Sequence, residues 1–156
     1  SEPRQKKSRE KSQKEDGMKQ SQRLLLTWLI EDTRLFELIE EYLGAEDFTE
    51  DIYQKTAQIL FEQYHRDGKV NPAQIINLFG EEDQSEIASL FHARIAKGET
   101  KADREKALKE TILRVKQNSI REHSKHLDPT DMAGLQKIIA DKKQLEKLEK
   151  TNISIP

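Results

Sequence analysis

The chain of 156 residues contains no cysteine. Disulfide bonds, a thiolate zinc site and a thiol nucleophile are therefore excluded, and we expect a cytoplasmic protein. No run of about 18 apolar residues and no signal-peptide layout occurs, so no membrane-spanning segment is expected. Glycine (6) and proline (4) are sparse. Charge is abundant instead: 36 % of residues are charged and 34 % are hydrophobic, which is enough for one modest core.

The net charge of −2 conceals an uneven distribution. Residues 1–17 have six basic and four acidic side chains, residues 18–98 have eight and fifteen, and residues 99–156 have thirteen and ten. An acidic centre repels phosphate. The small basic surplus at both ends is interleaved with acids. We therefore expect little or no direct DNA binding.

The periodicity of apolar residues divides the chain into three parts. Residues 1–17 have no apolar residue other than Pro3 and cannot offset their backbone entropy by burial, so they are predicted to be a disordered linker. The first residue is serine, so an upstream domain is expected. From Met18 onward the pattern is helical throughout, without strand alternation, and predicts an all-α fold. We expect a helical bundle over 18–116 and a C-terminal helical hairpin over 117–156.

Local signals set the predicted helix boundaries. Helices are expected over residues 18–32, 33–43, 49–66, 71–79, 83–97 and 101–127, followed by one last helix. Gly44 is placed as a left-handed C-cap, and Gly68 ends the third helix. Asn71 is the expected N-cap before Pro72. Asp83, with Glu86 three residues on, approximates a capping box.

The sequence Asp128-Pro129 ends the long helix, and Thr130 or Asp131 can cap the next one. So short a connection predicts an antiparallel hairpin. Helical-wheel pairing across this hairpin gives three expected contacts: Leu127 with Met132, Ile120 with Ile139, and Leu113 with Leu145.

The last helix has two apolar faces, and one neighbouring helix can cover only one of them. Met132, Leu135 and Ile139 form the first face, which we expect to lie inside the hairpin. The second face is predicted to bind a partner protein and consists of Ile138, Leu145, Leu148, Ile153 and Ile155. An amphipathic helix of this kind suits a groove in another protein. The alternative is a solvated face, because scattered exposed leucines are normal.

Other chemistry-bearing patterns are weak. His123 and His126 lie three residues apart, but zinc needs three or four ligands and no third one is close in sequence. Pairs of carboxylates lie in open, polar runs, so no acid–base site and no enzyme activity are expected. A helix-turn-helix over 71–97 fails because its second helix begins with acids. Trp28 is expected in the core.

One longer pattern resembles a known family. The segment LLLTWLIEDTRLFELIEEYLGAEDF is followed by a helix with AQILF, a helix that starts with NP, and a long helix that leads to a C-terminal hairpin. This order resembles the C-terminal helicase-interaction domain of bacterial replicative DNA primase, from about residue 20 to the end. The bundle is also similar to the N-terminal domain of the replicative helicase, to which that primase domain is structurally similar.

The resemblance implies a non-catalytic domain, with the polymerase and zinc-binding domains of the primase upstream. In that family the bundle is associated with stimulating the hexameric replicative DNA helicase, and the terminal hairpin, here residues 120–156, with docking onto it. No cofactor, metal or small-molecule substrate is expected, and the domain alone should be a monomer. The alternative is the self-association domain at the N-terminus of a replicative helicase.

Overall fold

The computed structural model describes residues 2–93 and 100–156, with side chains from Asp16 onward. Within these ranges the chain is all-α, as predicted, with seven α-helices, one 3₁₀ helix and no strand. In chain order the elements are α1 (Glu2–Glu31), α2 (Leu35–Glu40), η1 (Ala45–Asp47), α3 (Asp51–Asp67), α4 (Pro72–Asn77), α5 (Glu81–His92), α6 (Lys101–Lys125) and α7 (Met132–Lys150).

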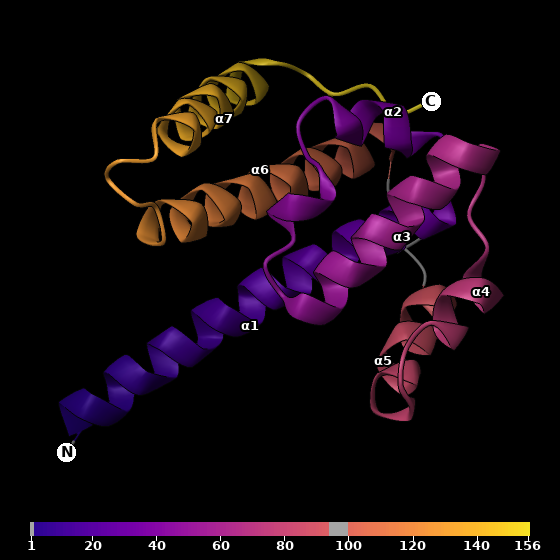
Figure 1. The fold of residues 1–156 in the computed structure, drawn as a ribbon, viewed down its shortest axis with the longest axis horizontal. Helices are drawn as coiled ribbons and strands as arrows, with labels where there is room; N and C mark the ends of the chain where they lie inside the picture. The colour runs from indigo at the N-terminus through magenta and orange to yellow at the C-terminus, as the bar shows by residue number, and fades with distance from the viewer. Residues whose placement is uncertain (1, 94–99) are drawn as a thin grey trace.

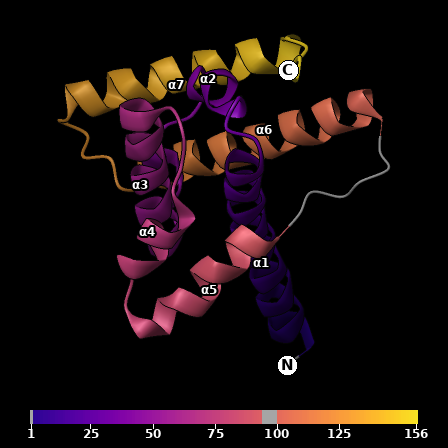
Figure 2. The same ribbon diagram turned by 90° about the vertical axis from the view of Figure 1, so that its right-hand side faces the viewer.

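Helix α6 joins the two parts of the fold. It packs against α1 and η1 on one side and against α7 on the other. In Figure 2, α6 and α7 run side by side across the top of the upright helices α1 and α3. The hairpin is therefore a layer laid over one end of the bundle.

The structure differs from the predicted linker at the N-terminus. Residues 2–17 are helical and continue without a break into the rest of α1, which extends beyond the other helices in Figure 1. Lysine, glutamate, glutamine and arginine are good helix formers. Adding residues to an existing helix also avoids the unfavourable nucleation step. The lack of apolar residues argues against packing of this segment into a core, but it does not prevent the segment from forming a helix.

Several predicted helix ends are confirmed. Gly68 ends α3 in the left-handed region at φ 69°. The Asn71 side chain accepts a hydrogen bond from the backbone N–H of Gln74, and Pro72 opens α4. At the start of α7, Asp131 is the cap, with its Oδ1 2.9 Å from the backbone nitrogen of Gly134.

Two other predicted ends are wrong. Gly44 lies at φ −119°, in extended backbone, because α2 already ends at Glu40. Its N–H instead donates to Asp47 Oδ2 at 2.8 Å, which closes the short helix η1. Helix α5 begins at Glu81 with Gly80 as N-cap, ahead of the predicted Asp83. Residues 94–97 of the predicted fifth helix lie outside the described residues.

One apolar cluster runs through the whole fold. Trp28 belongs to it and is 2 % exposed, so its predicted core position is confirmed. The Arg104 guanidinium lies over its ring, 5.5 Å from the centroid. Ile153 and Ile155, beyond α7, are members of the same cluster as Trp28. Because α6 also passes residue 117 without a break, the predicted boundary between bundle and hairpin does not divide the core.

Candidate partner-binding surface on the C-terminal hairpin

The turn between α6 and α7 is fixed by local hydrogen bonds. The backbone N–H and hydroxyl of Thr130 donate to Asp128 Oδ1 at 2.9 and 2.7 Å. These two bonds hold the pKa of the Asp128 carboxyl below its usual range. A Cβ on Gly134 would lie 2.6 Å from Leu127 Cδ1. Leu127 therefore packs on the glycine, across the turn, where the sequence predicted Met132.

The face predicted to bind a partner is internal. Ile138, Leu148, Ile153 and Ile155 are all buried, and Leu145 is half-buried. Leu148 and the two final isoleucines lie in the main core cluster. The prediction that this face is uncovered is wrong: α7 packs against α6, and Leu148 joins Ile153 and Ile155 in the main core cluster. Leu148, Ile153 and Ile155 thus attach the end of the hairpin to the main core.

The opposite face of α7 is the exposed one. Met132, Leu135 and Ile139 are 62, 40 and 46 % exposed. Their spacing of three and four residues places them in one line over two helical turns. The expected position of this face inside the hairpin, with Ile139 against Ile120, is therefore wrong: Ile120 is buried and Ile139 is not. We call Met132, Leu135 and Ile139 the outward stripe.

Basic residues continue the outward face toward the end of α7. Four lysines, Lys142, Lys143, Lys147 and Lys150, are exposed along the last three turns, together with Glu146 and Glu149. Within residues 2–93 and 100–156 none of these four lysines forms an ion pair. The surface of α7 is thus apolar near the turn and positively charged beyond it.

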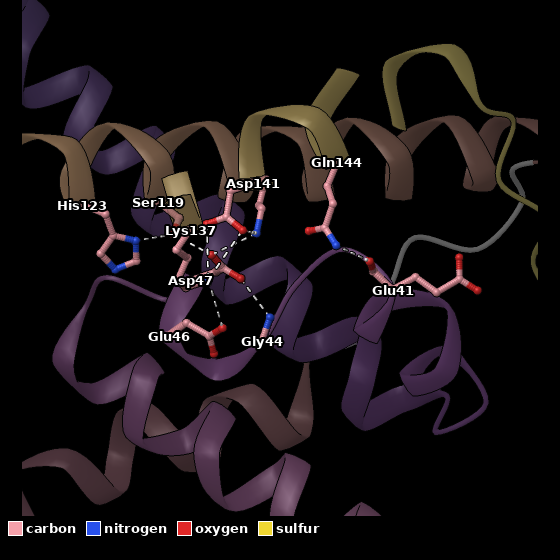
Figure 3. A network of polar contacts seen from close by, with 10 residues as sticks. Glu41, Gly44, Glu46, Asp47, Ser119, His123, Lys137, Asp141 and Gln144 are labelled. Carbon is pink, nitrogen blue, oxygen red and sulfur yellow. Dashed lines mark hydrogen bonds and ion pairs between the residues drawn. The ribbon is translucent and has the colours of Figure 1, made fainter. Parts of the chain in front are cut away.

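A buried group of charges lies beneath α7. The Lys116 ammonium on α6 is 3.1 Å from Asp141 Oδ1 on α7 and 3.5 Å from Asp47 Oδ1 on η1. All three side chains are buried, with Lys116 only 3 % exposed. Figure 3 shows Asp47 and Asp141 converging from their separate elements. We call Lys116, Asp47 and Asp141 the ionic cluster.

Neighbouring groups complete the hydrogen bonding of the ionic cluster. The Ser119 hydroxyl donates to Asp47 Oδ1 at 2.6 Å and lies 3.2 Å from His123 Nδ1. The Lys137 ammonium lies 3.3 Å from Asp141 Oδ2. Partial burial lowers the pKa of Lys137, but the carboxylate of Asp141 and its acidic neighbours outweigh it and raise the pKa above its ordinary value.

Sequence reasoning missed the ionic cluster. Its one available signal was Lys116, which lies on the helical wheel beside the apolar line of Leu108, Ile112 and Val115. A charged residue next to a buried stripe needs a partner of opposite charge. Neither Asp47 nor Asp141 could be chosen as that partner from spacing, because they are 69 and 25 residues away.

A cavity of about 310 Å³ lies between the hairpin turn, the inner side of α7 and η1. Leu127 and Ile138 form its apolar wall, and His123, Lys137 and Glu46 are among its polar residues. Among the described residues no group of His, Asp and Glu could hold a metal ion. In the same part of the chain no helix has the length and hydropathy to cross a membrane.

No protein-family model, curated protein or solved structure matches this chain. The class of protein that the structure itself defines is an all-α bundle with a C-terminal helical hairpin. Its most prominent unpartnered feature, among the described residues, is the outward stripe with its neighbouring lysines.

Proposed function

We propose that this chain is a non-catalytic interaction domain of a bacterial DNA primase that binds and stimulates the hexameric replicative helicase. In this role it couples primer synthesis to unwinding at the replication fork. The observation that supports the proposal best is the outward stripe, because it offers three aligned apolar side chains on the terminal hairpin. The order of helices in the sequence, with its resemblance to the primase domain, supplies the identity of the partner.

The outward stripe has the dimensions of a docking element. From Met132 to Ile139 it extends over seven residues, or roughly 10 Å at about 1.5 Å per residue. Aligned anchors of this kind lie in apolar grooves of partner proteins. The lysines beyond the stripe favour an acidic surface beside that groove. The affinity should therefore fall as salt screens this attraction.

The test is a titration of the chain into the purified helicase hexamer from the same bacterium. One variant replaces Met132, Leu135 and Ile139 with alanine. Its control replaces Leu24 and Leu78 with alanine. These two leucines lie elsewhere on the protein and are 41 and 55 % exposed. We expect the stripe variant to lose about tenfold or more in affinity, since the loss of one anchor residue worth about 1.4 kcal/mol already gives that factor. The control should bind like the wild type.

Two results would count against this proposal. A stripe variant that binds as tightly as its control would remove α7's outward face from the interface. A wild-type chain that does not bind the helicase at all would remove the primase assignment itself.

The same stripe could in principle join two copies of this chain, as a self-association domain of a helicase would require. A two-fold contact places the same patch of both copies together. Where the two α7 helices run parallel in such a contact, the unpaired lysines beyond the stripe would face their equivalents, and the like charges would repel. We therefore expect a monomer. Sedimentation of the isolated chain at micromolar concentration tests this, and an oligomer that the stripe variant abolishes would favour self-association.

A further inference from the structure

The bundle holds the two ends of α7 in different ways. Its C-terminal end is fixed by apolar packing, since Leu148 and the following Ile153 and Ile155 lie in the core cluster. Its N-terminal half, which carries the outward stripe, lies over the cavity of about 310 Å³. In that half Ile138 is buried but lies outside the core cluster. The polar contacts of Asp141 therefore contribute a larger share of the interactions that hold this half of α7 in place.

The ionic cluster is asymmetric about α7. Asp47 accepts hydrogen bonds from the Gly44 N–H at 2.8 Å and the Ser119 hydroxyl at 2.6 Å, and it also contacts Lys116. All of these partners lie outside α7, so they would stay in place if α7 moved. Among the described residues, Asp141 has Lys137 as a partner on its own helix and only Lys116 as a partner outside it. Within the cluster, the pair of Lys116 and Asp141 is the direct link between α7 and α6.

A second, weaker link runs beside the first. Lys137 on α7 lies 3.8 Å from Glu46, and both side chains are about half exposed. An ion pair in contact with water contributes little. The buried pair constrains the position of α7 more strongly. A buried carboxylate that is separated from its cation is left as an unpaired charge, which costs free energy unless it reaches water. Displacement of the N-terminal half of α7 would separate Asp141 from Lys116.

We propose that Lys116 is a positioning residue for partner docking: through Asp141 it holds the N-terminal half of α7, and so the outward stripe, in its docking pose. This inference rests on the proposed function. Lys116 lies beneath α7 and is 3 % exposed, so it acts on the partner only through the position of the helix.

The perturbing variant is Asp141→Asn, which removes the charge and keeps the size of the side chain. Its matched control is Glu62→Gln, the same kind of change at an exposed site on α3. We expect faster backbone hydrogen exchange over residues 132–141 in the free variant, with the bundle helices unchanged. If the docking pose is then populated about one-tenth of the time, the apparent affinity for the helicase falls about tenfold.

A cross-link tests whether the position of α7, and not the charge of Asp141 itself, determines the affinity for the helicase. The chain has no cysteine of its own, so Glu46→Cys with Lys137→Cys introduces a unique pair whose parent side chains already meet at 3.8 Å. A short bismaleimide joins η1 to α7 at this point. In the Asp141→Asn background the cross-linked protein should recover the affinity of the cross-linked protein that retains Asp141. The same two proteins without cross-linker give the baseline for the loss of Glu46 and Lys137.

Faster exchange, weaker binding and recovery on cross-linking together support the positioning role. The role is overturned if Asp141→Asn leaves exchange over residues 132–141 unchanged, or if exchange rises while affinity stays at the wild-type value. Weak binding that the cross-link does not restore also overturns it. If the wild-type chain fails to bind the helicase, the proposed function has failed. If the wild-type chain binds the helicase and Asp141→Asn changes neither exchange nor affinity, the positioning role of Lys116 has failed and the proposed function has not.

Discussion

Two leucines on one helix give the sharpest test of which face of α7 is internal. Leu148 is fully buried in the core cluster, whereas Leu135 on the outward stripe is 40 % exposed. The same substitution, leucine to alanine, has the same effect on helix propensity at both sites. Any difference in stability therefore reports packing alone.

The expected magnitudes differ several-fold. Removing a buried leucine side chain costs about 2–5 kcal/mol, because lost burial adds to the cavity left behind. In a domain of this length each kcal/mol lowers Tm by about 2–4 °C, so Leu148→Ala should lower it by roughly 4–20 °C. Leu135→Ala leaves no buried cavity, because position 135 is in contact with water in both the wild type and the variant. We expect it to cost less than about 1 kcal/mol.

Urea and thermal unfolding, followed by far-ultraviolet circular dichroism, measure both changes, and the helicase titration shows their effect on binding. Leu148→Ala should be destabilised, and folded Leu135→Ala should be the one with weakened helicase binding. Equal destabilisation by the two variants, or a greater loss of stability from Leu135→Ala, would refute the assignment of the inner and outer faces.

Two further predictions concern single side chains in the bundle. Burial, followed by the hydrogen bond that the Tyr53 hydroxyl donates to Glu86, raises the pKa of Tyr53 from 10.0 to about 12. The folded chain thus keeps this proton longer than the unfolded chain, and the associated stability is present below pH 10 and lost as pH rises from 10 to 12. Absorbance titration at alkaline pH should show a late phenolate step that Tyr53→Phe removes; a step that persists in the variant contradicts this. Gly68→Ala places a Cβ at φ 69° and should cost about 1 kcal/mol, whereas Gly80→Ala, at φ −66° with open space around it, should not; equal melting temperatures for the two variants would contradict the strain at Gly68.

Local signals predicted much of the fold, because they act through the nearest few residues. The Asn71–Pro72 start of α4 and the Gly68 end of α3 are confirmed, and each depends only on backbone geometry and a neighbouring hydrogen bond. Gly44 shows where this reasoning stops. It follows an apolar helix as a C-cap would, yet α2 ends four residues earlier and the carboxylate of Asp47 takes the glycine N–H.

The candidate site could be predicted only in part. The sequence placed a hairpin at the C-terminus and recognised two apolar faces on its last helix. A helical wheel gives the angle between two faces but not which one meets a neighbour. That choice depends on tertiary packing: α7 lies against α6, and Leu148 shares the core cluster with Ile153 and Ile155 beyond the helix.

The sequence by itself thus determined that the chain is helical, where most helices end, and that α7 has two apolar sides. Only the tertiary structure decided which side faces water and brought Lys116 to Asp47 and Asp141 from three separate elements. The physical reason is range. Caps and periodicity act within a few residues, whereas burial and ion pairing depend on contacts between segments far apart in the chain.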